Sequence, residues 1–348
     1  MTSRQDRNTR RSTRSSSARS SRRPQAARAR TPYAALGVMG LIVLGTVILL
    51  FFIIIRASGG PDDAPVENGI AGSGSTVAEA AASSETAAPT AADAPLIAAG
   101  LQALPAGSIT VNTVDLDDPV ALEAAGVSTD YLLTLVNSDF AVPQGYSPNL
   151  KELAASGLAM DTTAADHFVE MQHDIDAGTG TYLILSSGYR SPERQAELKK
   201  ETPGPSVQAA NHSEHQMGLA ADVYQSGSPT LTEAFASTPT YEWLDEHAHE
   251  YGFILRYHEG KEAVTGVPFE PWHFRYVGPV HAPLMKASGL VHEEYLDAFS
   301  LGTWYRAGEY VISRQAERTA IAVPEAATAT TVSPDNTGHY IVTAALPA

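Results

Sequence analysis

Two short polar segments, residues 213–222 and 270–273, constrain this chain more than any other part of it. The first has the pattern Ser-x-His-x-x-Gly-x-Ala-x-Asp, and the second is Glu-Pro-Trp-His. A hydrolytic zinc site takes three nitrogen or oxygen ligands from the protein and leaves a fourth position for water. A further carboxylate then accepts the proton of that water. The pattern therefore predicts that His215, Asp222 and His273 bind Zn²⁺ and that Glu270 is the catalytic base.

The residues that follow the first histidine favour a compact site. Gly218 permits a tight turn, and residues 219–224 have the composition of a β-strand. Alternate residues of a strand share one face, so Ala220 and Asp222 are expected to point the same way. The small side chain of Ala220 would leave room for a metal ion beside the carboxylate.

Proline determines the geometry of the second segment. Pro271 disfavours helical backbone at Glu270, so these residues are not expected to form a helical Glu-x-x-His pair. An extended, polyproline-like turn completes one rotation in three residues. Glu270 and His273 are therefore predicted to face the same side.

Local patterns predict further elements around these motifs. Apolar residues at helical spacing indicate a helix over residues 163–177, and the apolar residues 182–186 indicate a buried strand. Ser191 followed by Pro192 is typical of a helix N-terminus. Arg190 therefore lies at a strand-to-helix turn, where side chains commonly point into a site. Further along the chain, the sequence predicts a helix over residues 241–251 and a strand over residues 253–257. It then predicts a turn with a short extended piece over residues 261–267, and one or two helices over residues 283–299.

The N-terminal part of the sequence predicts a membrane anchor. Residues 1–32 are rich in Arg and have too few apolar residues to fold. Residues 33–55 carry no charge and are long enough to cross roughly 30 Å of hydrocarbon as a helix. Ten Arg before this stretch and only Arg56 directly after it predict a cytoplasmic N-terminus and an extracytoplasmic catalytic domain. A cleaved signal peptide is the alternative, but its apolar core usually has about 7–15 residues.

The remaining sequence divides by composition. Residues 56–105 are mostly small or polar and predict a flexible linker. Residues 106–300 are predicted to form the catalytic domain. Residues 301–348 contain three β-prone stretches, which favour a small β appendage, with a disordered tail as the alternative.

Charge and cysteine content exclude other classes of function. Residues 1–56 hold eleven Arg and one acid, whereas the rest of the chain holds 12 basic and 38 acidic residues. A nucleic-acid-binding domain needs a basic face, so nucleic acid is not an expected partner. The chain has no Cys, which leaves His, Asp and Glu as candidate metal ligands. The sequence does not indicate an oligomeric state.

Five motifs keep a characteristic order and spacing between residues 135 and 296. They are Leu-Val-Asn at 135–137 with Pro143 and Tyr146, Ser-Gly-Tyr-Arg-Ser at 187–191 with Gln195, the segment 213–222, the segment 251–257, and the segment 270–278. In this arrangement the chain resembles the VanY-type D-alanyl-D-alanine carboxypeptidases. One departure is Ala-Asn at residues 210–211, where the family usually has Pro-Gly. Asn tolerates the left-handed conformation better than most residues.

The resemblance implies an α+β fold in which a mixed or antiparallel sheet with flanking helices carries the zinc site. It also implies removal of the C-terminal D-Ala from peptidoglycan stem peptides. The residues expected to bind the terminal carboxylate and the developing oxyanion are Arg190, Gln195 and Ser213. Arg190 would also stabilise the tetrahedral intermediate, because its planar fork of donors suits paired oxygens.

Two alternatives follow from the same residues. An L,D-carboxypeptidase acting on tetrapeptide stems, or an endopeptidase, would use the same metal site. A wall-binding module with a vestigial metal site is the non-enzymatic alternative. The presence of Glu270 argues against that module, since a protein that only binds has no need of a base.

Overall fold

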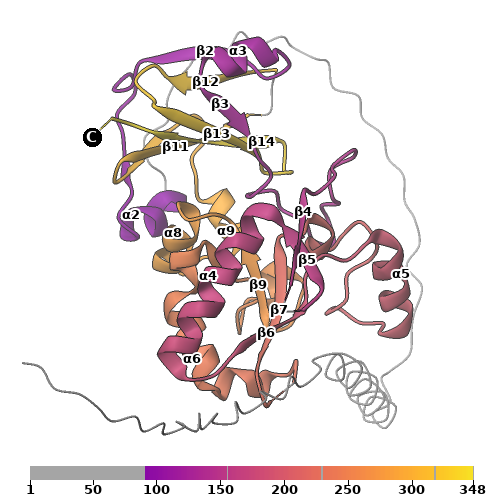
Figure 1. Cartoon of the computed structure of the whole chain (residues 1–348). Helices are drawn as coiled ribbons and strands as arrows, with labels where there is room; N and C mark the ends of the chain where they lie inside the picture. Colours follow the sequence, from indigo (N-terminus) through magenta and orange to yellow (C-terminus); the bar gives the residue numbers. More distant parts are fainter. Residues whose placement is uncertain (1–90, 155, 229, 317–318, 348) are drawn as a thin grey trace, which may run out of the picture. The chain divides into compact units, whose positions relative to one another are not determined.

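The computed structural model describes residues 91–347, apart from 155, 229 and 317–318 (Figure 1). The described residues all fall in one unit of the chain. The predicted cytoplasmic tail, the predicted transmembrane helix and most of the predicted linker fall in residues 1–90 and so lie outside the described residues. Within the part of the chain that is described, no helix is long and apolar enough to cross a membrane.

The candidate site is built on a four-stranded antiparallel sheet. In spatial order its strands are β6 (Leu183–Ser187), β7 (Ala220–Gln225), β9 (His273–Tyr276) and β8 (Phe253–Leu255). Asp222 on β7 is the register partner of His273 on β9. Directly opposed residues on neighbouring strands point to the same face. The register therefore brings together two side chains that are far apart in the sequence.

Helix α4 (Thr162–Thr179) packs on the opposite face of this sheet. Its buried Phe168 and Met171 share a core with Val223 of β7 and Phe274 of β9. Because successive strand residues alternate between faces, burying Val223 and Phe274 on this side turns their neighbours Asp222 and His273 to the other. Each fully buried apolar side chain stabilises the fold by about 1.5–3 kcal/mol.

Both ends of α4 have a local cause in the sequence. The side chain of Asp161 accepts hydrogen bonds from the first-turn N–H groups, and Gly180 ends the helix at φ 68°. The prediction of a helix over residues 163–177 is confirmed. Ser191 likewise caps α5 by accepting from the N–H of Arg194.

Short helices and one hairpin surround the sheet. They are β4 (Leu150–Leu153), β5 (Leu158–Asp161), α5 (Pro192–Glu201), η2 (Glu214–Met217), η3 (Glu233–Ser237), α6 (Pro239–His247), η4 (Ala248–Tyr251), α7 (Glu262–Thr265), α8 (His281–Ser288) and α9 (His292–Asp297). The expectation of an extended piece within residues 261–267 is wrong, because α7 forms there. Gly266 at φ 70° supplies the left-handed C-cap that lets this single turn close.

A second sheet contains both ends of the described chain. Its six strands lie in the order β1-β10-β11-β14-β13-β3, and β12 pairs with β2 in a separate ribbon. The elements are η1 (Ala91–Asp93), α2 (Ala94–Ala98), β1 (Gln102–Ala103), β2 (Val111–Asp115), α3 (Pro119–Ala124), β3 (Val127–Thr129), β10 (Trp304–Ala307), β11 (Tyr310–Ala316), β12 (Ala320–Pro324), β13 (Ala329–Pro334) and β14 (His339–Ala345). Figure 1 shows β11, β13 and β14 side by side, beside β3 from the N-terminal half.

This second sheet corrects two predicted boundaries. The linker does not extend to residue 105, because Leu96 and Leu101 are buried in a core with Tyr305 and Ile312. The boundary at residue 300 does not separate two folded parts either, since β2 pairs with β12 and β3 pairs with β13 across it. The tail alternative for residues 301–348 is wrong for β10–β14, which are regular strands. Pairing between strands so distant in sequence leaves no local signal, which is why composition misplaces these boundaries.

Candidate metal centre

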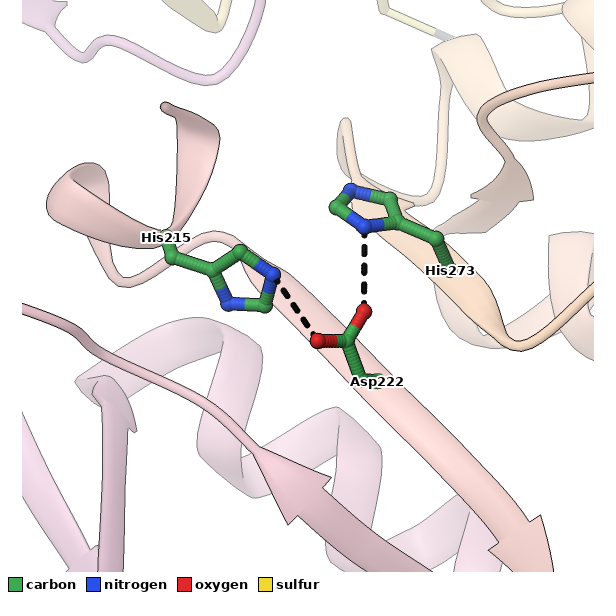
Figure 2. Close-up of side chains that lie close together, drawn as sticks. All are labelled: His215, Asp222 and His273. Atoms are coloured by element: carbon green, nitrogen blue, oxygen red, sulfur yellow. Dashed lines mark ion pairs between the residues drawn. The ribbon is translucent and has the colours of Figure 1, made fainter. Parts of the chain in front are cut away.

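Three predicted ligands converge on the face of the first sheet that points away from α4. His215, Asp222 and His273 each offer one ligand atom, and these atoms all lie within 4.8 Å of one another. Nε2 of His215 is 3.2 Å from Oδ2 of Asp222, and Nδ1 of His273 is 3.0 Å from Oδ1 of the same carboxylate. Figure 2 shows both imidazoles directed toward Asp222 from opposite sides. All three residues are buried.

His215 is held in place by its second ring nitrogen. It lies in η2, and its Nδ1 is 2.7 Å from the carbonyl oxygen of Gly188. Since a carbonyl can only accept, Nδ1 carries the hydrogen and Nε2 is left with its lone pair toward Asp222. A Cβ on Gly188 would come within 2.3 Å of the carbonyl oxygen of Ala159, so only glycine fits there.

His273 presents the other ring nitrogen. Its Nδ1 faces Asp222, and its Nε2 lies 3.5 Å from Oε2 of Glu214. Burial would lower the pKa of His273, but its interactions with Asp222 and Glu214 raise that pKa to about 9. A divalent cation and this proton would compete for the same nitrogen.

The remaining ligands have the charge states that a cation requires. Burial lowers the pKa of His215 although Asp222 opposes it, so this imidazole is neutral near pH 7. Burial would raise the pKa of Asp222, but the two imidazoles hold that pKa well below its ordinary value. Oδ1 of Asp222 makes no hydrogen bond of ordinary geometry among the described residues. Two imidazoles and an ionised carboxylate with an oxygen to spare fit a divalent ion such as zinc.

Glu270 lies beside these ligands with the properties of a base. It is 5% exposed, and its Oε2 is 3.8 Å from Nδ1 of His273, so the two residues share one side as predicted. Burial raises the pKa of Glu270 to about 7, with His273 acting in the opposite direction. A general base works best when its pKa is near the working pH.

Arg190 reaches the same site from the turn between β6 and α5. Its Nη2 is 3.6 Å from Oδ2 of Asp222 and donates to Oγ of Ser187 at 2.8 Å. Its Nη1 donates to Oε1 of Gln195 at 2.7 Å. Burial lowers the pKa of Arg190, with Asp222 opposing it, but a guanidinium stays charged near neutral pH.

The other two residues predicted to bind substrate are Gln195 and Ser213. Both polar groups of Gln195 are engaged, since its Nε2 donates to the carbonyl of Gln208 at 2.6 Å. Gln195 thus holds the Arg190 guanidinium on one side and the backbone at Gln208 on the other, and its contact with substrate stays a prediction. Ser213 is buried at the start of η2 and makes no capping bond there, and its contact with substrate stays a prediction.

A buried charge cluster adjoins the metal centre, and the sequence did not identify it. Glu214 accepts from Nε of Arg256 at 2.8 Å and lies 3.0 Å from Nη1 of Arg275. Burial would raise the pKa of Glu214, but these two guanidinium groups hold it well below its ordinary value. Arg256 also donates to Glu293 on α9. The available signal was an Arg inside each of two apolar segments, because a buried charge requires a partner.

The second sheet contacts the site through residues 130–142. Asn336 in the β13–β14 turn donates to the carbonyls of Leu135 and Ala141. The N–H of Val142 in turn donates to the carbonyl of Asn211 at 2.7 Å. Asn211 has φ 65°, so it adopts the left-handed conformation that the departure from Pro-Gly required. The β appendage therefore supports the loop that precedes His215.

The fold and the site together define an α+β protein with a candidate metal centre of the hydrolase type, and comparison with known proteins identifies the family. The family model for VanY, D-alanyl-D-alanine carboxypeptidase, matches residues 157–279. A D-alanyl-D-alanine carboxypeptidase of Enterococcus faecalis is 34% identical over 189 residues, which are 49% of this chain and 68% of that relative. The chain belongs to this family of enzymes.

Two other comparisons show how much of the chain is similar to known proteins. A D-alanyl-D-alanine carboxypeptidase of Enterococcus faecium is 41% identical over 145 residues, which are 42% of this chain and only 46% of that relative. The crystal structure of the vancomycin-resistance D,D-dipeptidase VanXYg in complex with a D-Ala-D-Ala phosphinate analog is similar at a TM-score of 0.56 and 26% identity. That similarity covers 69% of this chain and 100% of the VanXYg chain.

Proposed function

We propose that this chain is a zinc-dependent D,D-carboxypeptidase that removes the C-terminal D-Ala from peptidoglycan stem peptides. The observation that carries the proposal is the convergence of His215, Asp222 and His273 beside the buried Glu270. Family membership supports the reaction class. The intact base argues against a wall-binding module with a vestigial site.

The protein residues have distinct roles in this proposal. When bound by the three ligands, Zn²⁺ supplies Lewis acidity that makes water nucleophilic near neutral pH. Glu270 accepts the proton of the attacking water and then returns a proton to the leaving amine of D-Ala. Its raised pKa, about 7, suits both steps.

Arg190 is proposed to bind the terminal carboxylate of the substrate and to stabilise the negative charge that develops on the scissile carbonyl. A guanidinium has five N–H donors, and the contacts with Ser187 and Gln195 leave others for a ligand. The hydrogen bond that Arg190 donates to Gln195 fixes the orientation of the fork before substrate binds. Preorganised donors of this kind avoid the cost of reorientation during the reaction.

We also propose that the chain is anchored in the cell membrane by one helix over residues 33–55, with the catalytic unit outside the cell. The support is the uncharged stretch and the excess of Arg on its N-terminal side. Proteolysis of intact cells tests it: the catalytic unit should be cleaved from outside. Digestion that occurs only after lysis would contradict the proposed orientation.

The reaction is tested with defined muropeptides and the full chain purified in detergent. Release of D-alanine from a pentapeptide stem supports the proposal, and a chelator should abolish it. A tetrapeptide stem, a cross-linked dimer and free D-Ala-D-Ala, analysed by mass spectrometry, separate the L,D-carboxypeptidase, endopeptidase and dipeptidase activities. If product formed only from the tetrapeptide, the proposed D,D-carboxypeptidase activity would be wrong and the chain would be an L,D-carboxypeptidase.

Glu270→Gln tests the base, with Glu259→Gln as the matched control because Glu259 is exposed. The Glu270→Gln variant should retain zinc but release D-alanine about 10²–10⁴-fold more slowly. The Glu259→Gln variant should match the wild type. Undiminished turnover in the Glu270→Gln variant would remove Glu270 from this role.

A further inference from the structure

We infer that Glu214 is a positioning residue that fixes His273 as a metal ligand through the far side of its imidazole. The inference rests on the metal site of the proposed function and adds a residue to it. Glu214 immediately precedes one ligand in sequence but faces the other in space. Its side chain is 0% exposed, and its Oε2 lies 3.5 Å from Nε2 of His273.

The two facing atoms lack other partners. Among the described residues, neither Oε2 of Glu214 nor Nε2 of His273 makes a hydrogen bond of ordinary geometry. Buried polar groups are almost always hydrogen-bonded in folded proteins. A small rotation of the imidazole would close the gap between this donor and this acceptor. The geometry therefore directs the Nε2–H of His273 at the carboxylate.

The other carboxylate oxygen is held by two arginines. Nε of Arg256 lies 2.8 Å and Nη1 of Arg275 lies 3.0 Å from Oε1 of Glu214, and both guanidinium groups are fully buried. Replacing buried ion pairs by well-packed apolar residues is often neutral or stabilising, so stability alone does not account for the cluster. Holding Oε1 on the arginines leaves Oε2 pointing at His273.

This arrangement selects the tautomer that a ligand needs. His273 offers Nδ1 to the site, so its hydrogen must be on Nε2. A carboxylate that accepts this hydrogen fixes the tautomer and increases the basicity of the ligating nitrogen. His215 is oriented instead by a neutral acceptor, the carbonyl of Gly188. Of the two imidazoles, only His273 is backed by an anion.

Glu214→Gln is a sharp test because the arginines dictate how the amide must lie. The amide oxygen has to stay on Arg256 and Arg275, which can only donate. The amide NH₂ then turns toward His273 and donates to Nε2. That hydrogen bond favours the tautomer of His273 with hydrogen on Nδ1. A protonated Nδ1 has no lone pair to offer a metal in the site.

Glu293→Gln is the matched control. The side chain of Glu293 accepts from both Nη atoms of Arg256, at 2.6 and 2.8 Å, and from Nδ2 of Asn137. The substitution therefore removes one charge from the same cluster without altering the group that faces His273. Thermal unfolding of the metal-free proteins measures how much each substitution disturbs the fold itself.

The experiment measures zinc affinity of the full chain by competition with a chromophoric chelator, together with the visible spectrum of the Co²⁺ form. The Glu214→Gln variant should bind zinc about 10- to 100-fold more weakly and show an altered Co²⁺ spectrum. The Glu293→Gln variant should keep the affinity and the spectrum of the wild type. Equal losses in both variants, or a loss in neither, would overturn the inference.

Two further outcomes are informative. If Glu214→Gln does not fold, Glu214→Asp keeps the charge on the arginines but withdraws the carboxylate from His273, and it should also weaken zinc binding. Wild-type affinity in that variant would overturn the inference. A wild-type chain that binds no zinc would instead refute the proposed function, so the two failures are distinguishable.

Discussion

His281 provides a quantitative test of how the second sheet is joined to the catalytic unit. This residue, on α8, is 6% exposed. Its Nδ1 is 2.9 Å from the hydroxyl of Tyr295 on α9, and its Nε2 is 2.9 Å from Oγ1 of Thr343 on β14. The imidazole therefore bridges the helices and the second sheet. Each hydroxyl can donate or accept, so the neutral ring is satisfied in either tautomer.

Acid should weaken this bridge by an amount that follows from the pKa. Burial lowers the pKa of His281 from 6.5 to about 3. Because the folded pKa lies below the unfolded one, the stabilisation is complete above pH 6.5 and is lost as the pH falls toward 3. Each pH unit below 6.5 costs about 1.4 kcal/mol. The free energy of unfolding should therefore fall by about 2 kcal/mol between pH 8 and pH 5 from this residue alone.

The assay is urea unfolding of the chelator-treated protein at pH 8 and pH 5, which removes the contribution of bound metal. His281→Gln abolishes the titration at this position, and His173→Gln is the control, since His173 is exposed. The stability difference between wild type and the His281→Gln variant should be about 2 kcal/mol smaller at pH 5 than at pH 8. An unchanged difference would refute the argument that a neutral, buried His281 joins the two parts.

Two further predictions concern the site. Arg190→Lys should lower kcat/KM for a D-Ala-terminated peptide about 10- to 100-fold, because a lysine cannot reproduce the fork that Gln195 orients. A variant whose kcat/KM equals that of the wild type in steady-state kinetics would contradict this prediction. Asn211→Ala should lower the free energy of unfolding by about 1–2 kcal/mol, since alanine tolerates the left-handed conformation at φ 65° less well than asparagine does. Asn211→Gly is its control and should be close to the wild type in urea unfolding, and equal losses in both would show that strain is not the cause.

The sequence predicted the local elements of the site because their causes are local. The capped start of α5 after Ser191 follows from Ser-Pro, and the turn at Glu270 follows from Pro271. The alternation along β7 explains why Asp222 faces the site while Val223 enters the core. These features depend on residues within a few positions of one another.

Other features required the positions of distant strands. Glu214 is adjacent to His215 in sequence, but the role proposed for it depends on Arg256, directly after β8, and on Arg275 of β9. Which nitrogen each imidazole offers also depends on its distant neighbours, the Gly188 carbonyl for His215 and the Glu214 carboxylate for His273.

The amino-acid sequence was enough to identify the family and to predict the candidate metal ligands and the candidate base, because these depend on residue types at fixed spacing. Only the tertiary structure shows that β1 (Gln102–Ala103) pairs with β10 and that Glu214 lies behind His273. The physical reason is that backbone pairing and buried charge compensation act between residues far apart in the chain. Such contacts leave no periodic or local pattern in the sequence.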